Sequence, residues 1–396
     1  MKVLFITTQL PFPPKSGGTV KSWNYVKFLS EQYKLSVATL LKDEDLNYEK
    51  DFLKALSIDQ YLSEQVSIKR SPINLLKSYI SAPSLNVFRN ASTRFQNKIQ
   101  AVSKECNVLI IDHYEVFQYV PKEFNGKVIM HTHNAEFMLW QRMSELSNNP
   151  IQRLVLKLEA NRVKRYEKTI FENSDLVYST PSDIELYHKH GFNTSKHQST
   201  FHLGNDTLLE LPDLEFNETE KAITFIGTLS WEPNIDGIVW FLEHIWPSIL
   251  TRHSDCKLYI LGSSPDDRIK KAAKHYSQVI FTGFVDKLED YLKKTRVYIA
   301  PLRFGSGMKV KVLEGLYRGT PSVTTSVGAE GLAIRNEQEV MIADGPEKFA
   351  KHCLTLLEDE TLWAKLRDNS RKLAAKKYRW SDLFQQMDLS FKKLMT

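Results

Sequence analysis

The sequence predicts an α/β protein built from two domains of similar size. Three observations lead to this fold class. Short apolar strands alternate with helical stretches, the opening strand–loop–helix pattern recurs after residue 221, and 396 residues suffice for two or three domains. Such alternation is typical of a mostly parallel sheet covered by helices on both faces. We therefore expect ligands at the carboxyl ends of the strands, in a cleft between the two domains.

The first half of the chain opens with an apolar strand, Lys2–Thr7, and a loop rich in proline and glycine at residues 11–18. Apolar residues then recur every third position over residues 20–29, which predicts a helix. Further strands are expected at residues 35–41, 107–111, 127–130 and 176–179, and a long helix at 151–172.

The second half begins after an acidic stretch that contains Pro212. A strand is expected at residues 222–227, a turn at 231–234 and a helix at 238–245, followed by strands at 257–261, 279–281, 297–300 and 322–324. The predicted boundaries are a first domain of residues 1–203, a linker of 204–220, a second domain of 221–379 and a terminal helix of 380–396.

The composition is that of an ordinary folded protein, with 42% hydrophobic and 25% charged residues. No apolar run approaches the roughly 20 residues of a membrane helix, and the apolar start is too short for a signal peptide. Cys106, Cys256 and Cys353 offer neither a disulfide framework nor a metal-binding spacing. We expect a cytoplasmic protein in a reducing compartment.

The positive charge lies in the first half: Lys and Arg exceed Asp and Glu by six in residues 1–200 and equal them in residues 201–396. This bias suits an anionic partner, such as a membrane surface or a phosphorylated acceptor, or is simply a solvated surface. No nucleic-acid motif accompanies it. The basic, apolar stretches 66–99 and 151–172 could meet a membrane or pack on their own domain, and we favour packing.

Most of the chemistry lies in residues 301–331, where a glycine loop joins a strand to a short helix that Gly319 and Pro321 end. Glycines let the backbone approach a ligand, and the N–H groups of a first helical turn attract phosphate. We predict a diphosphate site with a carboxylate for the ribose; the alternative is a glycine turn before a helix with solvated lysines. Its members are Arg303, Gly305, Ser306, Gly307, Lys309, Lys311 and, for the ribose, Glu314.

This segment, Pro-Leu-Arg-x-Gly-x-Gly-x-Lys-x-Lys-x-Leu-Glu-Gly-x-x-x-Gly-x-Pro, resembles glycosyltransferase family 4, the group 1 glycosyltransferases. The resemblance covers nearly the whole chain. Within it, residues 227–236 are similar to the start of the family's second domain. It implies the GT-B fold of two facing Rossmann-like domains with an interdomain cleft. The first domain would bind the acceptor and the second the nucleotide sugar, and the terminal helix would cross back onto the first.

The resemblance also implies roles for single residues. His113 would be catalytic, beside the reacting sugar, and His133 with Glu136 would face the acceptor. The loop of Gly17 and Gly18 would lie near the donor phosphates, and Phe284 with Val285 would hold the base.

Two departures from the family stand out. Ser306 takes the place of a glutamate that relatives use near the transferred sugar, and the start of the second domain lacks the usual basic residues. His131 and His133 could share a strand face, but no third ligand has a recognisable spacing, so we expect no metal.

Together with these residues, the resemblance implies a retaining, metal-independent glycosyltransferase of hexosyl or related groups. A nucleotide diphosphate sugar would be a substrate rather than a cofactor. The acceptor would be a glycan or a lipid-linked group in surface polysaccharide or glycoconjugate biosynthesis. The basic first domain would contact the inner face of the membrane peripherally, where it would meet a lipid-linked acceptor. The alternatives are a GT-B nucleotide-sugar epimerase and a non-catalytic module that binds a nucleotide sugar or a partner.

Overall fold

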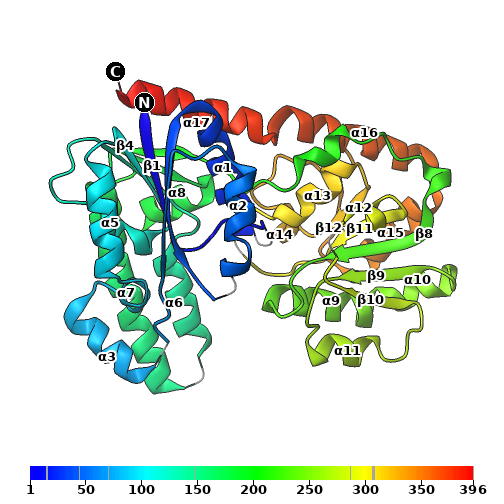
Figure 1. Cartoon of the computed structure of the whole chain (residues 1–396). Helices are drawn as coiled ribbons and strands as arrows, with labels where there is room; N and C mark the ends of the chain where they lie inside the picture. Colours follow the sequence, from blue (N-terminus) through cyan, green and yellow to red (C-terminus); the bar gives the residue numbers. More distant parts are fainter. Residues whose placement is uncertain are drawn as a thin grey trace. The chain divides into compact units, whose positions relative to one another are not determined.

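The computed structural model describes residues 1–14, 17–43, 45–69, 71–147, 149–285, 287–305 and 308–395. It divides into two compact units (Figure 1). Unit 1 comprises Met1–His202 and Leu383–Thr396, and unit 2 comprises Leu203–Asp382.

Unit 1 is built on a seven-stranded parallel sheet with the order β3-β2-β1-β4-β5-β6-β7. Its strands are β1 (Lys2–Thr7), β2 (Lys34–Leu41), β3 (Gln60–Gln65), β4 (Val108–Asp112), β5 (Lys127–His131), β6 (Leu176–Ser179) and β7 (His197–Ser199). The strand order reverses direction between β1 and β4. In open parallel sheets this switch point is where ligands bind, beyond the carboxyl ends of the strands.

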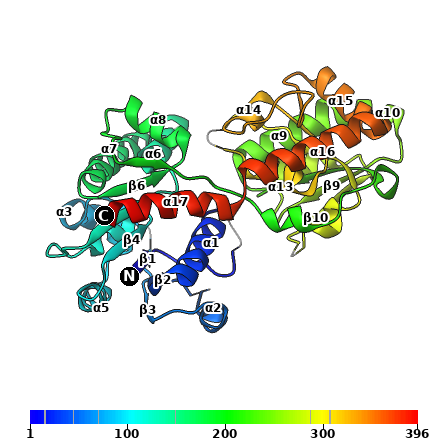
Figure 2. The same ribbon diagram turned by 90° about the horizontal axis from the view of Figure 1, so that it is seen from above.

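Helices surround this sheet (Figures 1 and 2). They are α1 (Gly17–Gln32), α2 (Glu49–Ala55), α3 (Pro72–Ser81), α4 (Leu85–Arg89), α5 (Thr93–Ser103), α6 (Glu136–Leu146), α7 (Pro150–Glu172), α8 (Pro181–Lys189) and most of α17 (Trp380–Met395), with 3-10 helices η1 (Asp45–Asn47) and η2 (Tyr114–Tyr119). Asn149 caps α7, since its side chain accepts hydrogen bonds from the N–H groups of Ile151 and Gln152. Phe384 of α17 stacks on Tyr25 of α1, so the end of the chain belongs to the core of unit 1.

Unit 2 contains a six-stranded parallel sheet with the order β10-β9-β8-β11-β12-β13. Its strands are β8 (Glu220–Ile226), β9 (Lys257–Leu261), β10 (Val279–Gly283), β11 (Thr295–Ala300), β12 (Ser322–Thr324) and β13 (Met341–Ile342). The strand order therefore repeats that of unit 1, and the switch point lies between β8 and β11.

The helices of unit 2 enclose a separate apolar core that includes Trp246 and Phe349, both fully buried. They are α9 (Glu232–His244), α10 (Trp246–Arg252), α11 (Asp267–Ala273), α12 (Glu289–Leu292), α13 (Val310–Arg318), α14 (Ser326–Ala329), α15 (Pro346–Glu358) and α16 (Glu360–Lys377), with η3 (Asp206–Glu210) and η4 (Phe216–Glu218). Gly319 ends α13 in a left-handed conformation, with φ of 76°.

The predicted α/β fold class is confirmed, and the strands expected at 176–179, 257–261 and 322–324 have the bounds of β6, β9 and β12. The structure also differs from the predicted elements in detail. The residues expected as a turn at 231–234 lead directly into α9, which begins at Glu232 because Pro233 suits a first helical turn. Strands β3, β7 and β13 were not anticipated. Residues 204–220, expected as a linker, contain η3 and η4 and lie within unit 2.

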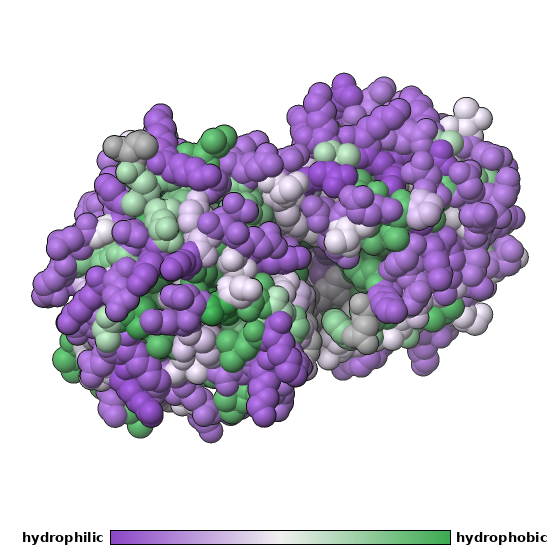
Figure 3. All heavy atoms as spheres, turned by 45° about the horizontal axis from the view of Figure 1, so that its top comes forward, coloured by the Kyte–Doolittle hydropathy of each residue, from purple (hydrophilic) through white to green (hydrophobic). Residues whose placement is uncertain are grey.

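The face of the molecule seen in Figure 3 is mainly hydrophilic, with hydrophobic residues in small groups. Among the helices of the described ranges, none has both the length and the apolar composition that a membrane span requires.

Candidate active site

A buried carboxylate lies at the switch point of unit 1. Asp112 is the last residue of β4 and stands in register with Thr7 of β1 and His131 of β5. One carboxylate oxygen, Oδ2, accepts hydrogen bonds from the hydroxyls of Thr7 (3.0 Å) and Ser22 (2.7 Å). Both hydroxyls are buried, so Asp112 joins β1, α1 and β4 at the carboxyl end of the sheet.

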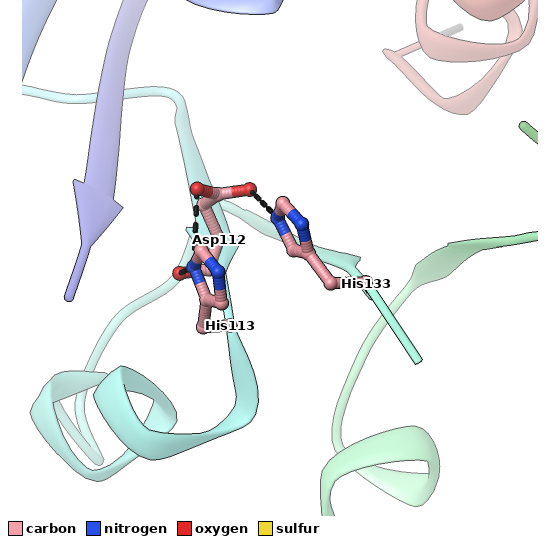
Figure 4. Close-up of side chains that lie close together, drawn as sticks. All are labelled: Asp112, His113 and His133. Carbon is pink, nitrogen blue, oxygen red and sulfur yellow. Dashed lines mark hydrogen bonds and ion pairs between the residues drawn. The ribbon is translucent and has the colours of Figure 1, made fainter. Parts of the chain in front are cut away.

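Three histidines surround this carboxylate. His131 Nδ1 lies 2.8 Å from Asp112 Oδ1. His133 Nε2 lies 2.7 Å from the same oxygen, and His113 Nδ1 lies 3.2 Å from Oδ2 (Figure 4). The His113 and His133 rings are stacked, with centroids 3.8 Å apart and an interplanar angle of 7°. His113 reaches this position with a backbone φ of 87°, which is costly for a residue other than glycine and is typical of functional sites.

The residues of this cluster differ in pKa, because each is affected by burial and by the charges of the others. Burial alone would raise the pKa of Asp112, but His133 and His113 hold it well below its ordinary value. Burial also opposes a charge on His113, yet the Asp112 carboxylate raises the pKa of His113 to about 9. Burial and the neighbouring charge of His113 lower the pKa of His133 well below its ordinary value. At neutral pH the stacked pair therefore carries one positive charge. His113 is protonated and His133 is neutral.

The ring of His133 leaves one nitrogen open. Its Nδ1 is buried and has no hydrogen-bond partner among the described residues. A Cβ atom at Gly18 would lie 3.5 Å from this nitrogen, so the first turn of α1 passes close to the ring. An acceptor nitrogen, the His113 cation and the positive end of a 16-residue helix meet here, a combination that suits a ligand bearing hydroxyl and anionic groups.

A second buried carboxylate supports the start of α6. Glu167 of α7 accepts hydrogen bonds from the N–H groups of Glu136 and Phe137, both at 3.0 Å. Burial, and then Glu115, raise the pKa of Glu136 to about 8, so its carboxyl group is protonated at neutral pH. His113, His133, Glu136 and Glu167 line the same small cavity. The structure thus brings together Gly18, His113, His133 and Glu136, which the sequence named from separate motifs.

Asp112, His113 and His133 offer ligand atoms within 4.8 Å of one another. The sequence shows no third ligand at a recognisable spacing from His131 and His133, but the parallel strands bring Asp112 to both. The geometry nevertheless suits hydrogen bonding better than a metal. An imidazole binds a metal in its own plane at about 2.0 Å. An ion cannot lie in the planes of two parallel rings stacked 3.8 Å apart.

In unit 2 two lysines meet at the start of α13. Lys309 occupies the position just before this helix, its side chain is almost buried, and its Nζ lies 3.6 Å from Glu330 Oε2. The Nζ atom of Lys311 donates a hydrogen bond to Asn234 of α9 and lies 4.9 Å from the centre of the Phe225 ring. Burial, and then the charge of Lys309, lower the pKa of Lys311 to about 7. An anion bound here would relieve this repulsion.

A glycine makes the approach of Lys311 to the end of β8 feasible. A Cβ atom at Gly227 would lie 2.7 Å from Asn234 Nδ2 and 3.0 Å from Lys311 Nζ. Gly227 therefore stands where no larger residue fits without displacing Asn234. Asn234 is held in turn by a 2.8 Å hydrogen bond to the Thr228 carbonyl.

Glu314 lies one helical turn beyond Lys311. Its Oε1 accepts a hydrogen bond from the Asn205 N–H at 3.1 Å. Its Oε2 is buried and unpaired within the part of the chain that the structure describes. Burial raises the pKa of Glu314 to about 7. A buried acceptor without a partner is costly, so this oxygen is ready to bind a hydroxyl group.

The other residues predicted to bind the nucleotide sugar lie in different surroundings, and some of them are already engaged by other side chains. Arg303 forms an ion pair with Asp236 of α9, so its charge is already engaged. Phe284 is 60% exposed after β10, whereas Val285 packs against the apolar cluster of Ala222, Tyr259 and Leu261. Gly305 has φ of 137°, which favours glycine. Ser306 and Gly307 lie outside the described residues, and Gly17 is the first residue of α1.

Sequence reasoning missed Asp112, Asn234 and Glu167. A signal existed for Asp112, since a carboxylate directly ends an otherwise apolar strand and precedes His113. Asn234 was assigned to a turn, and Glu167 lies within a long charged helix. Nothing in the local pattern distinguishes either of them from a solvated residue.

Comparison with known proteins bears on the fold. HepE from Anabaena, solved in complex with UDP, has a TM-score of 0.64 and 12% identity over 99% of this chain and 100% of its own. WaaG, a glycosyltransferase involved in lipopolysaccharide biosynthesis, has a TM-score of 0.64 and 13% identity over 98% and 99% of the two chains. Similarity at this level of identity shows a shared fold, here GT-B.

Sequence comparison adds the family. An uncharacterized 44.6 kDa protein in the cps region of Klebsiella pneumoniae is 21% identical over 89% of this chain and 90% of its own. Residues 220–359, which make up most of unit 2, match the family model described as Glycosyl transferases group 1. The predicted resemblance is thereby confirmed: the chain has the GT-B fold, and its residues 220–359 are similar to the group 1 glycosyltransferases.

Proposed function

We propose that this protein is a retaining, metal-independent glycosyltransferase that moves a sugar from a nucleotide diphosphate sugar to a glycan or lipid-linked acceptor. The observation that carries the proposal is the start of α13. Two near-buried lysines, Lys309 and Lys311, lie five and three residues before Glu314, whose Oε2 is buried without a partner among the described residues. Cations suit a diphosphate, and the carboxylate suits a ribose hydroxyl.

The two units would divide the chemistry. Unit 2 would hold the donor through Lys309, Lys311 and Glu314, and unit 1 would present His113, His133 and Glu136 to the acceptor and the reacting sugar. In the transfer the bond between the anomeric carbon and the diphosphate oxygen breaks, and the acceptor oxygen bonds to that carbon on the same face. The acceptor proton passes to the departing diphosphate, whose negative charge the lysines would stabilise.

The comparisons guide the choice of substrates. HepE was solved with UDP, and WaaG is described as acting in lipopolysaccharide biosynthesis. The relative from Klebsiella pneumoniae is described by its place in a cps region. We therefore propose a UDP-sugar as the first donor to test and a role in polysaccharide or glycoconjugate biosynthesis.

Nucleotide binding tests the donor site. We expect calorimetry to show binding of one nucleoside diphosphate among UDP, GDP and ADP. Binding should weaken roughly tenfold or more in Lys309→Ala and in Glu314→Ala, because each removes a charged or charge-assisted contact. Lys270→Ala, which removes an exposed lysine of α11, is the matched control and should bind like the unmodified protein.

Equal affinity of all four proteins would place the nucleotide elsewhere and contradict the proposal. Product analysis then separates the remaining functions. A transferase consumes the donor when an acceptor is supplied, an epimerase converts the donor alone, and a binding module leaves both unchanged.

A further inference from the structure

A fully buried lysine lies in α1, next to the Asp112 cluster. Lys21 is 1% exposed, and burial lowers its pKa to about 8 against the opposing effect of the Asp112 and Asp183 carboxylates. Its side chain is therefore mostly an ammonium ion at neutral pH. In the ranges that the structure describes, its only hydrogen bond goes to a backbone carbonyl and it forms no ion pair.

Such a lysine is costly for the fold. An ammonium ion that leaves water loses its hydration, and only a closely paired carboxylate with further hydrogen bonds offsets this loss. Lys21 has one hydrogen bond and no such partner among the described residues. Groups that weaken a fold in this way are typical of functional sites, where activity and stability make opposing demands. The position of Lys21 beside the cluster therefore points to a role in the function.

The Lys21 ammonium group holds the backbone next to one of the histidines. Its Nζ donates a hydrogen bond to the carbonyl of Thr132 at 2.8 Å, and Thr132 directly precedes His133. Ser22, the next residue of α1, donates a hydrogen bond to Asp112 Oδ2 at 2.7 Å. Two successive side chains of α1 thus contact both the central carboxylate and the segment that carries the His133 ring.

Other contacts attach the same segment to the end of the sheet. The N–H group and the hydroxyl of Thr132 donate hydrogen bonds to the Tyr178 carbonyl of β6, at 2.9 and 3.1 Å. His202, which follows β7, places its Nε2 atom 3.0 Å from the His133 carbonyl. Residues 132–133 are therefore held between β6, the chain after β7 and α1, and Lys21 supplies the attachment to α1.

The charge of Lys21 also acts on the rings of the cluster. Burial lowers the pKa of His131, His133 and His202, and the ammonium ion lowers each of them further. A neutral His133 that donates its Nε2 proton to the carboxylate has an acceptor at Nδ1. This Nδ1 atom is buried and has no partner within the described part of the chain.

We propose that Lys21 is a positioning residue of the transferase, whose ammonium group fixes residues 132–133 so that Nδ1 of His133 stays directed at a substrate hydroxyl beside Gly18. Lys21 itself contacts neither the substrate nor the reacting atoms, and it acts through His133. The inference rests on the proposed function, because it assigns a sugar hydroxyl to this nitrogen. The alternative is a lysine that only supports the fold.

Three variants distinguish these roles. Lys21→Met removes the ammonium group and keeps an unbranched side chain of similar length, and Lys21→Arg restores a cation with hydrogen-bond donors. Lys27→Met removes an exposed lysine of the same helix and is the matched control. We expect Lys21→Met to unfold at the same denaturant concentration as the unmodified protein or a higher one, because it no longer buries a charge. A lysine that only supports the fold predicts a lower one.

Histidine NMR gives a readout that needs no substrate. The pKa of His133 should rise in Lys21→Met, because an opposing positive charge is gone, and should return toward its original value in Lys21→Arg. Lys27→Met should leave it unchanged. An unchanged pKa of His133 in Lys21→Met would overturn the inference, as would failure of this variant to fold.

Kinetics with a UDP-sugar and an acceptor test the consequence for transfer. The kcat/KM for the acceptor should fall about tenfold or more in Lys21→Met and recover at least partly in Lys21→Arg, because a directed hydrogen bond to the substrate is weakened and then restored. An unchanged kcat/KM would also overturn the inference. UDP affinity should be the same in all variants, because none alters Lys309, Lys311 or Glu314. Loss of nucleotide binding in the unmodified protein would contradict the proposed function instead, and the NMR readout would still report on Lys21.

Discussion

Asp112→Asn should reduce transfer activity by roughly 10²- to 10⁴-fold, the range expected when a buried carboxylate that orients a histidine loses its charge. The amide can still accept hydrogen bonds from His131 and His133 at one atom, and the hydroxyls of Thr7 and Ser22 can rotate to accept from the other. The local shape is thus retained while the charge is lost. His113 then loses the largest influence that favours its charged form, while burial still opposes it, so its pKa should fall from about 9.

The pH dependence distinguishes this role from a purely structural one. If the His113 cation is the active form, activity of the unmodified protein falls as the pH rises through about 9. In Asp112→Asn the same descending limb should begin at a lower pH, in step with the lowered pKa of His113. Imidazole titration by NMR reports the pKa of His113 in both proteins, even where activity is too low to measure. Asp59→Asn, at an exposed carboxylate of unit 1, should change neither quantity. An unchanged pKa of His113 would contradict the assigned role of Asp112.

The two sheets were predictable because their central strands are buried on both faces. Strands such as β4 and β9 are short, nearly continuous apolar runs bounded by polar residues, so pattern alone located them. Edge strands escaped for the opposite reason. Residues 60–65 of β3 and 197–199 of β7 are polar and partly exposed, and they pair with only one neighbouring strand. Such segments read as loops in a single sequence.

The candidate sites were predictable only where their residues lie close together in the chain. Lys309, Lys311 and Glu314 share one helix start, so their spacing was informative. The Asp112 cluster depends on the register of β1, β4 and β5, which sets side chains from distant segments in one row. The charge states are still less accessible, because the pKa of His113 depends on burial and on a partner that only the fold supplies.

The same dependence on burial leads to a prediction for the nucleotide site. Lys311 has a pKa of about 7, because burial and the charge of Lys309 disfavour its ammonium form. A bound diphosphate favours that form and should raise the pKa of Lys311 toward its ordinary value of 10.5. Nucleotide binding above pH 7 must then take up a proton. By linkage, affinity should fall up to about tenfold for each pH unit above 7, and roughly one proton should be taken up per nucleotide near pH 8.5.

Calorimetry in buffers of different ionisation enthalpy measures this proton uptake directly. At pH 8.5 the pKa of Glu314, about 7, is well below the working pH, so its carboxylate is already charged and adds little to the exchange. Lys311→Met should bind nucleotide weakly at every pH and show almost no uptake, since the titrating group is gone. Lys270→Ala should match the unmodified protein, because this lysine is exposed and paired with Asp267. If the unmodified protein bound nucleotide equally well at pH 7 and pH 9 without proton uptake, Lys311 would not be a phosphate ligand. The positive charge at the phosphates would then have to come from Lys309, a conclusion that the Lys309→Ala variant tests independently.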